Sequence, residues 1–365
     1  METSTGNSLS PFEQWMKQQG IPVATGHAVD VRTLALGPWP RLGGKGAFAD
    51  LIGLEGVTSM FVAEIPPGGS LQPERHLYEE IIYIVEGSGA TVVWVEGGSK
   101  RTFEWQKGSL FALPLNSWHQ LFNGSGNEPV RLMSLNTAPM ILDLLRDEHF
   151  VFQNPHHFRD RYSDEPDYFV PSQKRFEGAS GDWSWETNFV SSVYNANLFP
   201  FERKVPGGDY VALEMADNAL VAHITTFPVG RYHKAHYHFG GAVILILSGK
   251  GYSLMWPKDL GPRPFSEGKG DRVVRIPFYD GVAFSPPDGW FHQHFNTGRE
   301  PARQLAFRYG GRHFEPRWIR ARWGGGAMDN LFTSVSRGGC MIDTEDEDPM
   351  ILSLFDKALK EEGTP

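Results

Sequence analysis

Two histidines, spaced two residues apart and followed by an apolar run, constrain this chain more than any other feature of its sequence. His236 and His238 precede the run AVILILSG. Side chains two apart on a β-strand point to the same face, so both imidazoles would face the same way. A third imidazole follows later, as His292 or His294. Because iron, zinc, copper and nickel ions bind imidazole readily, the pattern predicts a metal site within a β-structure.

The residues around these histidines resemble the two signature motifs of the cupin family. The first motif is matched by Gly230, His236, His238 and Gly249, and the second at every fixed position by Gly281, Pro287, Gly289, His292 and Asn296. The family's first motif also contains a glutamate ligand, and Ala242 stands in its place. By resemblance, His236, His238 and His292 are metal ligands and the carboxylate ligand is missing. The register of the second motif favours His292 over His294, and it leaves His233 as an outer or surface residue.

The same pair of motifs resembles a second, earlier stretch of the chain. The residues at the motif positions are Gly68, Glu74, His76, Glu80, Gly87, Gly108, Pro114, His119 and Asn123. Two departures stand out, because Glu74 replaces the first histidine and Asn116 replaces a glycine. A repeated unit of this kind predicts two cupin domains in one chain. The predicted fold class is therefore all-β, with two double-stranded β-helix (jelly-roll) barrels and short N- and C-terminal helices.

The first barrel offers a different set of metal donors. Glu74, His76, Glu80 and His119 would supply two carboxylates and two imidazoles. Carboxylates favour harder ions such as Mn(II) or Fe(II), with Zn(II) as an alternative. In the competing interpretation this barrel is structural and Glu74 pairs with Arg75 or another neighbour. Glu79 has the opposite strand parity, so we expect it to face solvent.

The length of 365 residues fits two domains with extensions. The predicted divisions are an N-terminal helix and arm (1–55), barrel 1 (56–140), a helical or irregular connector (141–200), barrel 2 (201–315), and a C-terminal segment with an amphipathic helix (316–365). Ser10 and Glu13 form a capping box with Pro11 between them, and Asp348-Pro349 opens the last helix. The arm packs either on barrel 1 or on a partner subunit.

Composition narrows the classes of partner. The formal net charge of -9 gives no general reason to expect binding to nucleic acid or to an anionic membrane. The single cysteine, Cys340, excludes an intramolecular disulfide and a thiolate cluster. No signal peptide and no membrane-length apolar run is recognisable, so we expect a cytoplasmic protein, and by resemblance a homo-oligomer.

The missing carboxylate suggests the chemistry. Three neutral imidazoles leave the full charge of a divalent ion and open coordination positions for an anionic substrate and O2. This resembles the three-histidine iron sites of gentisate and salicylate dioxygenases, which are bicupins. The resemblance implies Fe(II), with Mn(II), Zn(II) or Ni(II) as alternatives, and an enzyme that cleaves a small aromatic or enolic carboxylic acid. Arg308, on the strand after the second motif, is the predicted partner of the substrate anion.

Two other functions fit the same sequence. If the catalytic metal lies in barrel 1, the site resembles those of oxalate decarboxylase and quercetin dioxygenase, and Glu80 or Glu74 could act as the acid or base. The chain could also be a non-catalytic cupin that binds a small molecule. Oxygen consumption separates the dioxygenase from the binding protein, and substitutions in each barrel separate the two enzymes.

Overall fold

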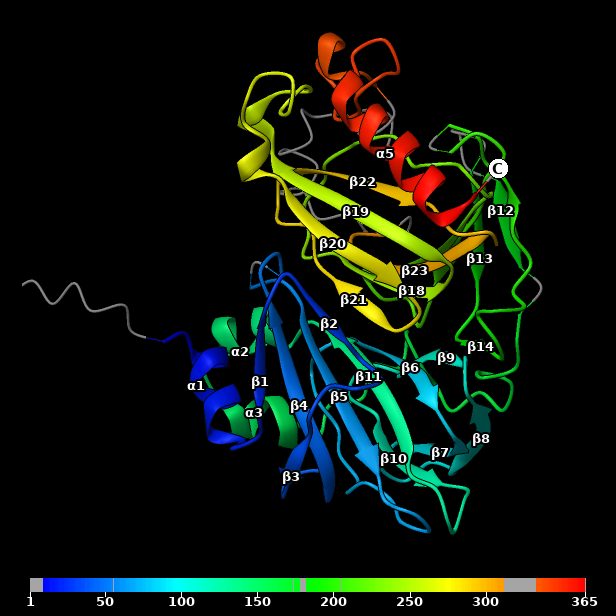
Figure 1. Cartoon of the computed structure of the whole chain (residues 1–365). Helices are drawn as coiled ribbons and strands as arrows, with labels where there is room; N and C mark the ends of the chain where they lie inside the picture. The colour runs from blue at the N-terminus through cyan, green and yellow to red at the C-terminus, as the bar shows by residue number, and fades with distance from the viewer. Residues whose placement is uncertain are drawn as a thin grey trace, which may run out of the picture.

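The computed structural model describes residues 9–54, 56–172, 174–177, 182–203, 205–311 and 333–364. The chain forms two β-structures that lie one above the other (Figure 1). The lower one is built from the N-terminal half and the upper one from the C-terminal half, with the last helix across its outer face. This arrangement confirms the predicted all-β fold of two jelly-roll barrels. The first part of the predicted C-terminal segment, up to residue 332, lies outside the described residues.

Barrel 1 combines an eight-stranded sheet, in the order β1-β4-β5-β11-β6-β9-β14 with β3 paired to β4, and a three-stranded sheet, β10-β7-β8. Its strands are β1 (Val23–Gly26), β3 (Gly37–Trp39), β4 (Gly44–Leu51), β5 (Ser59–Ile65), β6 (Glu80–Glu86), β7 (Ser88–Trp94), β8 (Arg101–Gln106), β9 (Leu110–Ala112), β10 (Trp118–Asn123), β11 (Val130–Asn136) and β14 (Phe189–Val190). The sheet thus includes β3 and β4, which lie within the segment predicted as an arm.

Barrel 2 repeats this plan with a nine-stranded sheet, β12-β13-β16-β17-β23-β18-β21-β2 with β15 paired to β16, and a three-stranded sheet, β20-β19-β22. Its strands are β2 (Ala28–Asp30), β12 (Arg175–Glu177), β13 (Trp183–Glu186), β15 (Phe199–Pro200), β16 (Asp209–Glu214), β17 (Leu220–Phe227), β18 (Val243–Ser248), β19 (Lys250–Pro257), β20 (Val274–Tyr279), β21 (Val282–Phe284), β22 (Trp290–Asn296) and β23 (Ala302–Tyr309). The apolar run after the histidine pair is β18, which is buried in the sheet.

Strands from the arm and from the connector complete the sheets of the two barrels. β2, from the N-terminal arm, pairs with β21 of barrel 2, and β14, from the connector, pairs with β9 of barrel 1. The arm therefore packs on both barrels of its own chain, since β1 also pairs with β4 of barrel 1. One apolar cluster contains buried residues of both barrels, among them Met133 and Leu135 from the first and Leu245 and Leu305 from the second. These contacts join the barrels through a common core.

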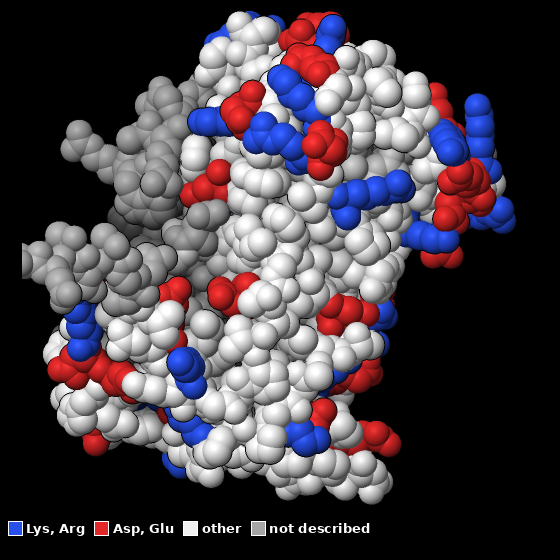
Figure 2. Space-filling model, turned by 60° about the vertical axis from the view of Figure 1, so that its left-hand side comes forward, with Lys and Arg blue, Asp and Glu red and all other residues white. Residues whose placement is uncertain are grey.

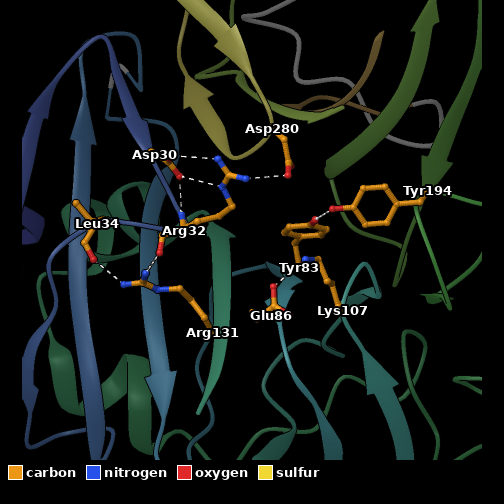
Figure 3. Close-up of polar contacts among 9 residues, drawn as sticks. All are labelled: Asp30, Arg32, Leu34, Tyr83, Glu86, Lys107, Arg131, Tyr194 and Asp280. Atoms are coloured by element: carbon orange, nitrogen blue, oxygen red, sulfur yellow. Dashed lines mark hydrogen bonds and ion pairs between the residues drawn. The ribbon is translucent and has the colours of Figure 1, made fainter. Parts of the chain in front are cut away.

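Polar contacts made by the arm and the connector lie along the seam between the barrels (Figure 3). The hydroxyl groups of Tyr83 and Tyr194 lie 2.9 Å apart, and Arg32 of the arm donates to Asp280 of barrel 2 at 2.9 Å. Gly281, the first glycine of the second cupin motif, has a φ of +91° beside this ion pair. A Cβ there would lie 2.2 Å from Nε of Arg32, so the glycine allows the arm to approach closely.

Glu79 makes another contact between the barrels, and the prediction that it faces solvent is wrong. Its carboxylate accepts hydrogen bonds from the backbone N–H groups of Ala219 (3.1 Å) and Leu220 (2.9 Å), at the start of β17 in barrel 2. Arg161 of the connector also donates to it at 3.1 Å. Strand parity predicted correctly that Glu79 points away from the neighbouring Glu80, but the opposite face is covered by barrel 2.

The helices cover the outer surfaces, and they are α1 (Pro11–Gln18), α2 (Ala138–Leu145), α3 (Glu148–Gln153), α5 (Pro349–Glu362) and the short 3-10 helices η1 (Lys258–Leu260), η2 (Gly270–Arg272) and η4 (Val335–Arg337). Both predicted caps are confirmed: Ser10 and Glu13 form the capping box of α1, and Asp348 caps α5. Ile351 and Phe355 of α5 are buried, whereas Leu354 is 39% exposed.

Two helices, α2 and α3, form the helical part of the segment that follows barrel 1. Arg146 adopts a left-handed conformation with φ of 55°, which ends α2, and Asp147 accepts a hydrogen bond from the N–H of Phe150 to begin α3. The turn brings α3 back against α2 and over barrel 1 (Figure 1).

Surface charge is mixed on the face in Figure 2, where acidic and basic side chains are interspersed around a broad uncharged band. Within the described ranges, no helix has both the length and the hydrophobicity needed to cross a lipid bilayer.

Candidate metal centres

The two sets of motif residues occupy equivalent backbone positions. In barrel 1, Glu74 and His119 exchange backbone hydrogen bonds of 3.0 and 2.9 Å. In barrel 2, His236 and His292 exchange bonds of 3.2 and 2.9 Å in the same antiparallel arrangement. His76 therefore corresponds to His238, and Glu80 to Ala242.

In barrel 2, the side chains of His236, His238 and His292 converge. Their rings lie 4.3 to 5.7 Å apart between centroids, and one nitrogen of each ring lies within 4.8 Å of the others. His236 and His292 are buried, and His238 is half-buried. His294 is not a member of this group, in line with the register of the second motif.

Backbone carbonyls fix the tautomers of this site. Nδ1 of His236 lies 3.1 Å from the carbonyl oxygen of Lys234, and Nδ1 of His292 lies 3.2 Å from that of Trp290. A carbonyl only accepts, so each Nδ1 carries the hydrogen and each Nε2 keeps its lone pair. Orienting contacts of this kind are usual for histidines that bind metals. The three residues therefore fit a divalent transition metal held by neutral imidazoles.

A cavity adjoins the three histidines and contains the predicted anion partner. The described residues that line it are Tyr210, His223, His233, His236, His238, Ala242, Ile244, His292, His294, Gln304, Ala306, Phe307 and Arg308. Arg308 is half-buried and lies close enough to Tyr210 to influence it: burial raises the pKa of Tyr210, and the Arg308 charge partly offsets this. None of these lining residues is acidic, so the cavity suits an anion.

Besides the half-buried His223, two further histidines, His233 and His294, line the same cavity. The Nδ1 atom of His294 is hydrogen-bonded to the Ser253 hydroxyl at 2.9 Å. His233 lies with its ring 4.6 Å from that of His236, and its Nδ1 lies 2.9 Å from the carbonyl oxygen of Lys234. Both are buried, so His233 is an outer neighbour of the site rather than a surface residue.

Gln304 is a residue of the cavity that sequence reasoning missed. It is 3% exposed, and its side-chain oxygen accepts no hydrogen bond from the described residues. The signal was present in the sequence, because Gln304, Ala306 and Arg308 alternate along β23 and share one face. A buried amide oxygen without a donor is costly in the absence of a ligand or water.

Comparison of equivalent strands explains why barrel 2 has this cavity. In barrel 1, Ser134 of β11 pairs with Ile82, and in barrel 2, Ala306 of β23 pairs with Ile244. Ser134 and Ala306 are therefore equivalent positions. Two residues earlier on the same strands, Leu132 is equivalent to Gln304. Together with the change from Glu80 to Ala242, these replacements remove a carboxylate and a hydroxyl group and introduce a buried amide. The space and its polarity therefore arise from a few substitutions on an unchanged scaffold.

Barrel 1 has a second candidate centre, formed by His76, Glu80 and His119, whose ligand atoms also lie within 4.8 Å of one another. All three side chains are buried, and Nε2 of His76 lies 3.1 Å from Oε2 of Glu80. Nδ1 of His76 faces the carbonyl of Tyr78 at 2.8 Å, and Nδ1 of His119 faces that of Ser117 at 3.2 Å. The Nε2 atoms are again left as ligands, and two imidazoles with one carboxylate fit Mn(II) or Fe(II).

Glu74, the fourth predicted ligand of barrel 1, is held by another group. Its Oε2 forms an ion pair with Arg41 at 2.5 Å, while its Oε1 lies 3.8 Å from Nε2 of His119. The alternative partner, Arg75, instead donates to the carbonyl of Gln153 at 2.9 Å. Burial would raise the pKa of Glu74, but Arg41 and then His119 hold it well below its ordinary value.

The charges of this cluster also shift the pKa values of neighbouring side chains. Burial would lower the pKa of His119, but Glu74 and then Glu80 raise it above the ordinary value. Burial, followed by the charge of Glu74, raises the pKa of Tyr78, whose ring stacks on His76 at 3.7 Å. Glu80 also accepts a hydrogen bond from Ser134.

Comparisons with known proteins support the cupin assignment. Residues 61–136 match the family described as Cupin domain. No curated protein matches the sequence. A variant of oxalate decarboxylase from Bacillus subtilis is 12% identical with a TM-score of 0.51, and the similarity covers 84% of this chain and 87% of that chain. A structure of the same enzyme concerned with its Mn(II) centres is 13% identical with a TM-score of 0.50 over the same shares.

At this low identity, the likeness shows the fold alone. The cupin domain and the shared architecture together support a bicupin of the cupin superfamily. A closer relationship to gentisate or salicylate dioxygenases is not among these findings. The function therefore depends on the residues of the two sites.

Proposed function

We propose that this chain is a metal-dependent enzyme that cleaves a small hydroxylated aromatic or enolic carboxylic acid with O2, and that the reaction centre is in barrel 2. The observation that carries the proposal is the convergence of three neutral imidazoles in a cavity where Ala242 replaces a carboxylate ligand. An Fe(II) ion held by His236, His238 and His292 would supply a Lewis acid for the substrate anion and would activate O2.

Arg308 and Gln304 would bind and orient the substrate. They lie on the same face of β23, with Ala306 between them, and all three line the cavity. Arg308 is half-buried and would bind the carboxylate, since a guanidinium matches that group geometrically. Gln304 is buried, and its side-chain oxygen, which has no hydrogen-bond donor among the described residues, would accept a hydrogen bond from a substrate hydroxyl. A substrate lying along β23 would then need both groups.

The reaction balances without a further reductant. One carbon–carbon bond of the substrate breaks, and both atoms of O2 enter the product as carbonyl or carboxyl oxygen. The residues of the cavity therefore need to bind the organic acid, orient it and limit the access of water. The burial of His236, His292, His294 and Gln304 is consistent with that task.

Oxygen uptake by the protein reconstituted anaerobically with Fe(II) tests the proposal. A panel of hydroxybenzoates should include at least one substrate that consumes one O2 per molecule and loses its aromatic absorbance, while benzoate, which has no hydroxyl group, should be inert. Failure of every hydroxy acid, or turnover that does not depend on O2, would reject the proposed reaction.

A second candidate function is a decarboxylase-type or quercetinase-type reaction in barrel 1. The observation in its favour is the group of His76, Glu80 and His119, together with the fold shared with oxalate decarboxylase. Glu80 or Glu74 would then serve as an acid or base beside the metal rather than as a ligand. Decarboxylation would release CO2 without net consumption of O2 and would depend on His76. A chain that turns over neither class of acid would be a small-molecule-binding cupin.

A further inference from the structure

We infer that Arg41 withholds Glu74 from the metal site of barrel 1, so that this barrel binds a divalent cation through His76, Glu80 and His119 alone. The inference concerns barrel 1 and is independent of the function proposed for barrel 2. It assigns Arg41, a residue of the N-terminal arm, as a positioning residue that sets the number of ligands.

The contact between Arg41 and Glu74 is direct. Nη1 of Arg41 lies 2.5 Å from Oε2 of Glu74. The other carboxylate oxygen of Glu74 is 3.8 Å from Nε2 of His119, whereas Glu80 lies 3.1 Å from Nε2 of His76. Glu80 is thus placed among the imidazole nitrogens, while Glu74 is directed towards the guanidinium.

Arg41 has no substitute for this partner among the described residues. Its Nε and Nη2 atoms are buried and have no hydrogen-bond acceptor there. Its Cζ lies 5.4, 5.6 and 5.1 Å from the ring centroids of Trp15, Trp39 and Phe152. These rings attract the cation but carry no charge, so Glu74, with a smaller contribution from Glu80, compensates Arg41. The side chains of Arg41 and Glu74 are 26% and 16% exposed, so the pair is partly buried, and removing one partner leaves the other charge poorly solvated.

Three separate elements hold this arrangement. Trp15 comes from α1, Trp39 from β3 and Phe152 from α3, and the ring of Trp15 stacks on that of Phe152 at 5.7 Å. Arg41 itself follows β3 in a turn. Aromatic rings from these three elements pack against the guanidinium and limit its movement.

The consequence is that the barrels offer different three-ligand sets. Barrel 2 offers three imidazoles, and barrel 1 offers two imidazoles and one carboxylate. At the backbone position that supplies His236 in barrel 2, barrel 1 has an ion pair in place of a ligand. A harder cation such as Mn(II) should therefore prefer barrel 1.

Mn(II) titration by calorimetry, with electron paramagnetic resonance to report the bound ion, tests the inference. The full chain carrying His236→Ala and His292→Ala leaves only barrel 1 available. Glu74→Gln and Glu80→Gln, two substitutions of the same size and charge change, are compared in this background. We expect Glu74→Gln to bind Mn(II) within about threefold of its parent and Glu80→Gln to bind it at least about tenfold more weakly.

Arg41→Met provides the converse test. It should tighten Mn(II) binding by about tenfold, because Glu74 becomes a fourth ligand, and the added substitution Glu74→Gln should remove the gain. If Arg41→Met does not fold, the Glu74→Gln and Glu80→Gln pair decides alone. Equal losses in that pair, or no Mn(II) binding by their parent, would overturn the inference.

Discussion

Glu74 of barrel 1 and His236 of barrel 2 occupy the same backbone position, each paired through reciprocal hydrogen bonds with the histidine of the second motif. Their side chains have different partners. Glu74 is ion-paired with Arg41, whereas His236 joins two other imidazoles beside a cavity. The barrel thus fixes where the side chain stands, and the residue type decides what chemistry it can support.

Arg308→Gln should weaken binding of the carboxylate substrate. A charge-assisted hydrogen bond in a partly buried site contributes about 1.5–3 kcal/mol, so we expect KM to rise by about 10- to 100-fold with a smaller change in kcat. Arg272→Gln, an arginine whose side chain is 52% exposed, is the matched control and should change neither. Steady-state kinetics measure both, and an unchanged KM for Arg308→Gln would remove this residue from substrate binding.

Ala242→Glu combined with Ala306→Ser should add to the three imidazoles of barrel 2 the carboxylate that barrel 1 has at the equivalent position. In barrel 1 the equivalent Glu80 accepts a hydrogen bond from Ser134, so the serine should help to orient the new carboxylate. We expect metal affinity to rise by at least about tenfold and turnover to fall, because the carboxylate occupies a position otherwise open to substrate. Ala306→Ser alone is the control. Undiminished turnover in the double variant would show that substrate does not need the coordination position that the new carboxylate occupies.

Glu79→Gln should weaken the attachment between the barrels. The substitution removes the charge that binds Arg161 and the backbone N–H groups of Ala219 and Leu220, at a side chain that is only 14% exposed. We expect a loss of about 1–3 kcal/mol in the free energy of unfolding, measured with chemical denaturant. Glu86, whose side chain is 62% exposed and pairs with Lys107, provides the control. Glu86→Gln should lower the free energy of unfolding by less than about 1 kcal/mol. Equal effects would show that the contact across the seam is not specific.

Asp348 should make the packing of α5 dependent on pH. Burial would raise its pKa, but hydrogen bonds from Ser266, then from the N–H groups of Met350 and Phe265, lower it below the ordinary value of 3.8. A carboxyl whose pKa is lower in the folded state stabilises that state fully above its unfolded pKa. This contribution is lost as the pH falls below 3.8 and through the folded-state pKa.

Asp348→Asn should therefore lower the free energy of unfolding by about 1–2 kcal/mol near neutral pH. This difference from the wild type should shrink as the pH falls below 3.8. Thermal unfolding across a pH series measures it. Asp356→Asn, on the exposed side of α5, is the control and should show no such trend. A constant difference for Asp348→Asn at all pH values would contradict the assigned role of its charge.

The sequence predicted the fold and the positions of the motif residues because both depend on local patterns. The histidine spacing, the apolar run of β18 and the capping residues Ser10 and Asp348 each carry their information within a few residues. The partner of Glu74 could not be found in this way. Arg41 lies in the arm, and only the folded chain brings the two together.

The same limit explains the remaining differences. The strand parity of Glu79 predicts an exposed side chain, but barrel 2 covers the side of barrel 1 to which it points. Glu79 and its partner Ala219 lie far apart in the sequence, so local patterns do not predict their contact. Gln304 could have been identified from the alternation along β23, yet its buried and unpaired oxygen is visible only in the packed barrel. Local periodicity predicts which way a side chain points, and tertiary packing determines what it meets.

Elemental analysis of anaerobically purified wild type, His236→Ala and His76→Ala tests the central claim most directly. Circular dichroism should show all three folded, because apolar strands such as β18 carry the core. If barrel 2 is the reaction centre, His236→Ala loses iron and O2 uptake, while His76→Ala keeps both and loses only the metal of barrel 1. Iron retained in His236→Ala and lost in His76→Ala would contradict the account and place the reaction in barrel 1.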